Sequence, residues 1–275
     1  MNSIVSHLIE FQFSRGNTHL FLYTKCNSAK FFGDLGFYEI ARIEDQIVFM
    51  ENRKDGFSSY LDQLAQSRID APKVAAIVMN ANPFTLGHQY LVEKAAGEND
   101  AVHLFMVSED ASLFPYAVRK KLILEGTRHL TNIRYHDSGP YIISQATFPS
   151  YFQKDAEAVI ASHANLDLAI FTKIAHRLGI TSRYVGEEPT SVVTGLYNQV
   201  MQQRLPDAGI QCIVVPRRAE QGEVVSASTV RKAIQEGNWE RVREQVPPTT
   251  WDFLQSEAAR PILAKIQKEQ DVVHY

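Results

Sequence analysis

The sequence predicts an α/β fold in which a small α/β module precedes a doubly wound parallel sheet. Three observations lead to this prediction. Residues 74–79 and 102–107 are continuous apolar runs of strand length, which is typical of strands in a parallel sheet covered on both faces. Segments with helical spacing alternate with such strands, as in a Rossmann-like fold. The chain has 275 residues, of which 45% are hydrophobic, so it can bury a large core.

The first part of the chain predicts the smaller module. It combines strand signals with the signal of a short helix, at Leu20–Tyr23, Phe31–Phe32, Leu35–Tyr38 and Ile47–Met50. Between Glu51 and Lys73 the pattern becomes polar and broken, which suits a connecting helix or linker. We therefore expect one module over residues 1–65 and a main domain over residues 72–275.

The main domain is expected to begin with a strand, a loop and a helix, followed by a second strand. The loop runs from Asn80 to Thr85, and apolar residues then recur at helical spacing, at Leu91, Val92, Ala95 and Ala96. Further elements are a helix with one apolar face and two strands, marked by Ile170, Phe171, Ile174 and Leu178, by Arg183–Val185, and by Cys212–Val215. The stretch from Trp251 to Gln270 is expected to be helical.

The composition excludes several classes of protein. The 28 basic and 31 acidic residues give a formal charge of -3 without a long run of either sign, so no field for nucleic acid or anionic membrane is expected. Cys26 and Cys212 are too few for a disulfide framework and lack zinc-site spacing, so we expect ordinary thiols and no protein metal site. Without a cationic leader or a membrane-spanning stretch, we expect a cytoplasmic protein.

The most informative segment is the loop between the first core strand and its helix, Asn80-Ala81-Asn82-Pro83-Phe84-Thr85-Leu86-Gly87-His88. Open α/β sheets bind ligands at such a position. Gly87 lets a ligand approach the backbone, the helix offers free N–H groups, and Thr85 and His88 can hydrogen-bond phosphate oxygens. These features suit a triphosphate. By itself, however, a histidine in a tetrapeptide like that from Thr85 to His88 is more often a helix cap or a packed side chain than part of a phosphate site.

A second segment, Ser226-Ala227-Ser228-Thr229-Val230-Arg231, precedes helical sequence. It supplies hydroxyls, unpaired N–H groups and a fixed cation, all useful around a departing pyrophosphate, although a simple N-cap is the alternative. Gly186 and Glu187 follow a predicted strand, where a carboxylate could accept hydrogen bonds from ribose hydroxyls; a plain turn is almost equally consistent. The predicted nucleotide-binding residues are Asn80, Asn82, Pro83, Phe84, Thr85, Gly87, His88, Gly186, Glu187, Ser226, Ser228, Thr229 and Arg231.

The two segments resemble, in the same order, the HxGH and ISSTK-like motifs of the nucleotidyltransferase superfamily. Thr85 stands where the superfamily pattern often has a first histidine, so His88 is expected to be the main imidazole. The chain also resembles the citrate lyase ligase family over most of its length. The blocks that carry this second resemblance are Asn80–His88, Tyr141–Phe152, Val185–Pro189, Tyr197–Asn198 and Ser226–Ser228.

The family resemblance implies that the chain uses ATP and Mg²⁺ to activate acetate as acetyl adenylate. The acetyl group would pass to the thiol of the prosthetic group on the citrate lyase acyl carrier subunit, with AMP and diphosphate released. His88, Thr85 and Arg231 would be the catalytic residues, stabilising the phosphates, and Mg²⁺ would be held mostly by phosphate oxygens. No nucleic acid or membrane partner is implied.

Three further expectations concern segments around this site. Arg119 is a candidate phosphate contact, although an arginine on an exposed helix is commoner. The resemblance places Tyr141, Ser144 and Thr147 in the acetate or prosthetic-group pocket, whereas hydrophobic packing explains the aromatic residues of that block equally well. The segment from Leu20 to Asn52 is similar to the C-terminal half of an acetyltransferase-like domain, which implies a structural or carrier-docking role.

Two other functions remain open at this point. The same site could adenylylate a phosphorylated cofactor precursor, which would yield a dinucleotide and no AMP. Alternatively, the chain could be a nucleotide-binding or docking subunit without catalysis. The products formed from ATP separate all three hypotheses.

Overall fold

Parallel strands form a five-stranded central sheet in the computed structural model, which describes residues 2–142, 156–187, 192–217, 219–220 and 223–269. Their order is β6-β5-β4-β7-β8, and every neighbouring pair is parallel. The strands are β4 (Val74–Met79), β5 (Ala101–Met106), β6 (Ile133–Asp137), β7 (Ser182–Gly186) and β8 (Gln211–Val215). The predicted doubly wound sheet is therefore confirmed; β6 is the strand that sequence patterns did not indicate.

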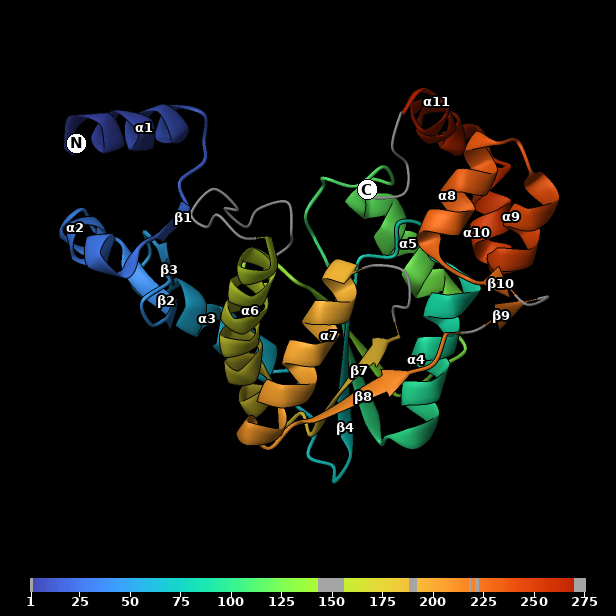
Figure 1. Ribbon diagram of the computed structural model, residues 1–275, viewed down its shortest axis with the longest axis horizontal. Helices are drawn as coiled ribbons and strands as arrows, with labels where there is room; N and C mark the ends of the chain where they lie inside the picture. The colour runs from blue at the N-terminus through green and yellow to red at the C-terminus, as the bar shows by residue number, and fades with distance from the viewer. Residues whose placement is uncertain (1, 143–155, 188–191, 218, 221–222, 270–275) are drawn as a thin grey trace.

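Helices cover both faces of this sheet (Figure 1). Alternate residues of β4 enter opposite hydrophobic clusters: Val74 and Ala76 pack with the α6 and α7 side, and Ala75 and Ile77 with the α4 and α5 side. Burial on both faces is the reason why this strand is apolar throughout. The helices are α4 (Leu86–Glu98), α5 (Tyr116–Gly126), α6 (Ala156–Leu178) and α7 (Val192–Arg204).

The C-terminal helices form a third cluster beside α5 (Figure 1). They are α8 (Ala227–Gln235), α9 (Trp239–Gln245), α10 (Pro248–Leu254) and α11 (Arg260–Lys268), preceded by the short strands β9 (Ala219–Glu220) and β10 (Glu223–Val224). The helical prediction for residues 251–270 is confirmed in part, because a 3₁₀ turn at Glu257–Ala259 separates two helices and α10 already begins at Pro248.

The N-terminal segment folds around an antiparallel sheet of order β1-β3-β2. One face of this sheet, including Ile40 and Phe49, shares a hydrophobic cluster with α6; the other face, including Val48, packs on Ala29 and Phe37. Its elements are α1 (Asn2–Ser14), β1 (Phe21–Thr24), α2 (Ala29–Asp34), β2 (Tyr38–Ile43), β3 (Ile47–Glu51) and α3 (Gly56–Ala65). This hydrophobic cluster contains residues from both sides of the predicted linker. The division into residues 1–65 and 72–275 therefore stays a proposal.

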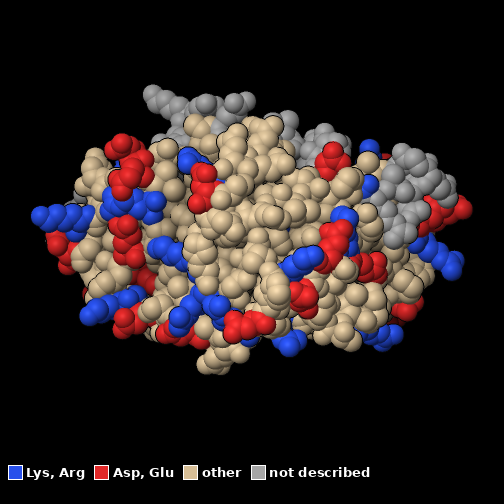
Figure 2. All heavy atoms as spheres, turned by 90° about the horizontal axis from the view of Figure 1, so that it is seen from below, with Lys and Arg blue, Asp and Glu red and all other residues tan. Residues whose placement is uncertain are grey.

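The surface seen in Figure 2 carries basic and acidic side chains interspersed, without a large field of one sign on that face. Among the helices of the described ranges, none combines the length and the apolar character needed to cross a membrane. The described residues also bring together no group of three or more His, Cys, Asp or Glu side chains that could hold a metal ion.

Two histidines form a buried pair between neighbouring strands. His103 Nδ1 of β5 and His136 Nε2 of β6 lie 2.8 Å apart, and the Phe105 ring stacks on His136. Burial is the main reason why the pKa of each ring is lowered from 6.5 to about 4. Both rings are consequently neutral in the folded protein at neutral pH.

The protein should lose stability on acidification because of this pair. In the unfolded chain each ring takes up a proton near pH 6.5, whereas the folded protein protonates it only near pH 4. The free energy of unfolding contributed by the pair is therefore complete above pH 6.5 and decreases as the pH falls toward 4. Urea denaturation would measure how much the free energy of unfolding falls between pH 7.5 and pH 5. This decrease should be smaller in His136→Gln than in the wild type, because the variant lacks one titrating ring. An equal decrease in both proteins would contradict this prediction.

Candidate functional site

The loop after β4 lies where the sheet changes its winding direction. β4 pairs with β5 on one side and with β7 on the other, and residues 80–85 connect its carboxyl end to α4. Ligands of open α/β sheets bind outside the carboxyl ends of the strands at such a switch point. The structure therefore places the predicted loop at the position where a ligand site is expected.

Thr85 caps α4 and also orients His88. The Thr85 hydroxyl accepts from the backbone N–H of His88 (3.4 Å), and His88 Nδ1 accepts from the backbone N–H of Thr85 (3.1 Å). The hydroxyl also lies 2.9 Å from Nδ1. Because a backbone N–H can only donate, Nδ1 carries no proton, and the neutral ring carries its proton on Nε2. Thr85, only 1% exposed, thus selects the tautomer with an Nε2–H donor.

His88 remains neutral well below neutral pH. Burial, followed by the positive charges of Arg217 and Arg231, lowers its pKa from 6.5 to about 4. The Phe84 ring packs against the imidazole with 5.8 Å between the ring centroids. A neutral N–H donor surrounded by cations is suited to bind an anion without changing its own protonation state.

The second predicted segment starts α8 with the same kind of cap. The Ser226 hydroxyl accepts from the backbone N–H of Thr229, and the Thr229 hydroxyl accepts from that of Ser226, both at 3.1 Å. Ser228 places its hydroxyl 2.8 Å from that of Ser226, and Thr229 donates to Gln245 of α9 at 2.6 Å. The N-cap alternative is therefore confirmed for Ser226, and it leaves the helix start available as an anion-binding end.

The starts of α4 and α8 lie against each other. A Cβ atom on Gly87 would lie 3.0 Å from the backbone oxygen of Val225, so the contact favours glycine there. Arg231, 3% exposed, donates from Nη1 to the backbone oxygen of Asn82 at 2.5 Å and joins α8 to the loop after β4. Two helix N-termini, each with partial positive charge and unpaired N–H groups, thus meet at one place.

The other loop residues predicted to bind nucleotide are largely buried and shape the loop. Asn82 accepts from the backbone N–H of Phe114 at 3.0 Å, and the backbone oxygen of Phe84 accepts from Thr250 at 2.9 Å. Pro83 is buried as well. These contacts hold the loop in place at the switch point, and the direct binding of a nucleotide by these residues stays a prediction.

The turn after β7 joins the same region through an arginine that sequence patterns did not indicate. Asn198 of α7 donates to the backbone oxygen of Gly186 (3.0 Å), and the Glu187 N–H donates to Val215 (2.8 Å). Arg217 Nε donates to the backbone oxygen of Glu187 at 2.6 Å. A signal for Arg217 exists, since it follows the apolar run of β8 and therefore lies at the carboxyl edge of the sheet.

Arg119 does not take the exposed position on a helix that was the commoner expectation. It is 1% exposed, and its guanidinium donates to protein oxygens of the loops after β4 and β5. The acceptors are the backbone oxygens of Phe114, Asn80, Val107 and Glu109 and the side-chain oxygen of Asn80. Arg119 therefore holds two loops together, which favours a structural role and corrects the expectation of an exposed helical position; a phosphate contact of Arg119 stays a prediction.

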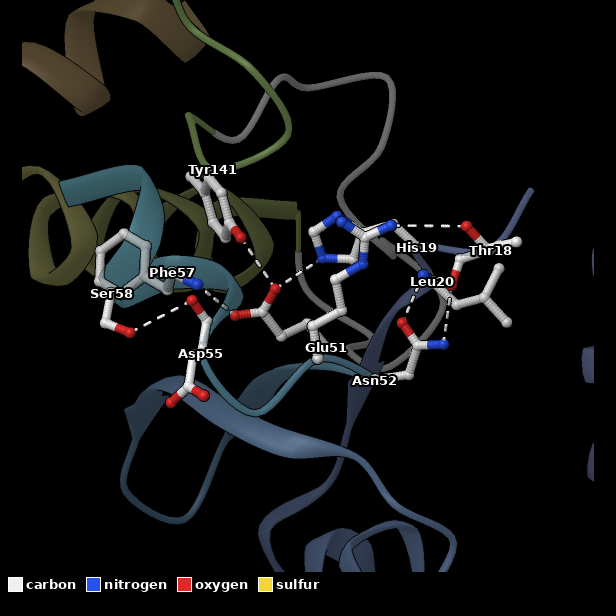
Figure 3. A network of polar contacts seen from close by, with 10 residues as sticks. Thr18, His19, Leu20, Glu51, Asn52, Asp55, Phe57, Ser58 and Tyr141 are labelled. Carbon is white, nitrogen blue, oxygen red and sulfur yellow. Dashed lines mark hydrogen bonds and ion pairs between the residues drawn. The ribbon is translucent and has the colours of Figure 1, made fainter. Parts of the chain in front are cut away.

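Tyr141 faces the N-terminal module. Figure 3 shows the buried Glu51 carboxylate accepting from Tyr141 (2.8 Å) and from the Phe57 backbone (2.7 Å), with His19 Nε2 at 2.6 Å. The hydroxyl of Tyr141 is therefore engaged in packing the module against the loop after β6. This geometry favours the packing alternative over a pocket role for Tyr141; Ser144 and Thr147 lie outside the described residues.

The sequence of this part of the chain matches a known protein family. The model described as "Citrate lyase ligase C-terminal domain" matches residues 74–254, which is more than half of the chain and includes both helix-start segments. The chain belongs to the citrate lyase ligase family. Citrate lyase ligases are enzymes, and the chain is accordingly an enzyme of the ligase class.

Citrate lyase ligase relatives match nearly the whole chain. The "[Citrate [pro-3S]-lyase] ligase" of Haemophilus influenzae is 42% identical over 92% of this chain and 77% of the relative. That of Klebsiella pneumoniae is 43% identical over 91% of this chain and 75% of the relative. A putative nicotinate-nucleotide adenylyltransferase structure from Vibrio parahaemolyticus is similar at a TM-score of 0.42 and 17% identity, covering 72% of this chain and 98% of that chain.

Proposed function

We propose that this citrate lyase ligase uses ATP to activate acetate and transfers the acetyl group to the prosthetic-group thiol of the citrate lyase acyl carrier subunit. The names of the relatives support citrate lyase as the partner. The observation that carries the nucleotide part is the meeting of α4 and α8 at Gly87, with neutral His88 and two arginines beside it. Such a cluster of donors and positive charge suits a polyphosphate.

In the first step, an acetate oxygen attacks the α-phosphorus of ATP. The bond from that phosphorus to the bridging oxygen breaks, and pyrophosphate leaves with the electron pair. The Nε2–H of His88 and the N–H groups of the two helix starts would stabilise the charge that develops on the phosphates. No protein nucleophile is needed, because positioning and charge stabilisation account for catalysis.

In the second step, the carrier thiolate attacks the acetyl carbonyl of the adenylate. A carbon–sulfur bond forms, the carbon–oxygen bond to the phosphate breaks, and AMP leaves with the electron pair. Mg²⁺ would be held mainly by phosphate oxygens, where it would neutralise charge. The donors of His88 and the helix starts then hold the nucleotide through the remaining oxygens.

The products formed from ATP test this proposal. Purified protein with MgATP, acetate and deacetylated carrier should form AMP, pyrophosphate and acetylated carrier in equal amounts, measured by chromatography and by the mass of the carrier. Omitting acetate should abolish AMP formation. A dinucleotide product with a phosphorylated cofactor precursor would instead support the adenylyltransferase alternative, and ATP binding without AMP formation would support a docking subunit.

A further inference from the structure

We propose that Arg217 contacts the polyphosphate of the bound nucleotide, at the part that leaves as pyrophosphate, whereas Arg231 is a positioning residue that holds the loop after β4. This inference rests on the proposed use of ATP and assigns the phosphate-binding cation within that site. Arg231 belongs to the ISSTK-like motif and was expected to stabilise the phosphates, whereas Arg217 lies outside both motifs.

The hydrogen bonds of Arg217 connect its guanidinium to the end of β7 and to the residue just before the cap of α8. Nε donates to Glu187 at the end of β7 (2.6 Å), and Nη1 lies 3.5 Å from the backbone oxygen of Val225. That same oxygen lies 3.0 Å from where a Cβ atom of Gly87 would be. The guanidinium is therefore held beside the junction of the α4 and α8 starts, at the carboxyl edge of the sheet.

The contacts to Glu187 and Val225 fix the direction of the Arg217 guanidinium. Both acceptors are backbone oxygens, one at the end of β7 and one just before α8, so these two hydrogen bonds orient the planar group at the edge of the sheet. The charge also reaches His88, whose pKa it lowers more than Arg231 does. A cation this close to the Nε2–H donor of His88 adds to the positive ends of the two helices and favours a ligand with several negative charges.

Arg231 differs from Arg217 in burial and in its acceptor. It is 3% exposed and donates to the backbone oxygen of Asn82, whereas Arg217 is partly exposed. A ligand on the outer side of the sheet edge reaches a partly exposed guanidinium more directly than a buried one. The two arginines therefore have different roles: Arg231 holds the loop after β4, and Arg217 contacts the phosphates.

A ligand series distinguishes a phosphate contact from a structural role of Arg217. Calorimetry would measure the dissociation constants of MgATP, pyrophosphate and adenosine for the wild type, Arg217→Gln and Arg217→Lys. Arg128→Gln is the matched control, because exposed Arg128 lies just before the amino end of β6, at the opposite edge of the sheet. We expect Arg217→Gln to weaken MgATP and pyrophosphate binding about ten- to a hundredfold, the factor for one charge-assisted hydrogen bond.

Adenosine binding should change by less than about twofold in Arg217→Gln, since adenosine carries no phosphate, and Arg217→Lys should keep part of the affinity. The Arg128→Gln control should match the wild type. Unchanged pyrophosphate and MgATP affinities in Arg217→Gln would overturn the inference, and so would an equal loss for adenosine, which indicates a deformed pocket. A wild type that binds no MgATP would overturn the proposed function as well, so the two failures are distinguishable.

Discussion

Replacement of His88 by alanine is expected to lower the rate of acetate-dependent exchange between pyrophosphate and ATP about a hundredfold. The variant loses the Nε2–H donor that the Thr85 backbone orients through Nδ1. Removal of one preorganised donor from a site of this kind commonly costs a factor of about a hundred or more. The fold should survive, because α4 keeps the Thr85 hydroxyl as its N-cap, bonded to the backbone N–H of residue 88.

The exchange assay requires a histidine control and a pH series. His129→Ala is the control, since the exposed His129 pairs only with Glu93 on the surface among the contacts described for it. The exchange rate is also measured against pH in the wild type and in His88→Ala. Because the pKa of His88 is lowered to about 4, His88 should contribute no change in rate near pH 6.5. An undiminished exchange rate in His88→Ala would remove His88 from the mechanism, whereas a step near pH 6.5 that disappears in the variant would contradict the lowered pKa of His88.

Replacement of Arg119 by methionine is expected to lower the free energy of unfolding by about 3 kcal/mol or more. Methionine fills a similar volume but donates no hydrogen bond, so the buried oxygens of Asn80, Val107, Glu109 and Phe114 lose their shared donor. An unsatisfied buried polar group costs about 1–3 kcal/mol, and neighbouring losses are not strictly additive. Nucleotide binding should weaken too, because Asn80 begins the loop after β4.

Urea denaturation of Arg119→Met beside Arg128→Met measures this effect. Arg128 is exposed, so its replacement removes the same charge with little change in stability. Arg119→Lys should also be destabilised, since an ammonium cannot reach acceptors arranged around a planar guanidinium. Equal midpoints for Arg119→Met and Arg128→Met would contradict the structural role of Arg119.

The elements that the sequence predicted share one property: their signal is local. β4 is apolar on both faces because both faces are covered, and this is visible in six consecutive residues. β6 gave no such signal because it lies at the edge of the sheet and combines buried Ile133 and His136 with exposed Arg134 and Asp137. An edge strand keeps polar residues on its exposed side, so the pattern of a core strand does not apply to it.

The sequence by itself determined that Thr85 and Ser226 begin helices and that both starts lie next to strands or turns of an α/β fold, because a cap and its helix are neighbours in the chain. Only the tertiary structure decided that these starts meet at Gly87 and that Arg217 lies beside them. Only the tertiary structure also decided that the side chain of Arg119 is buried. The direction of a long side chain depends on acceptors that distant segments supply, and local sequence patterns carry no record of them.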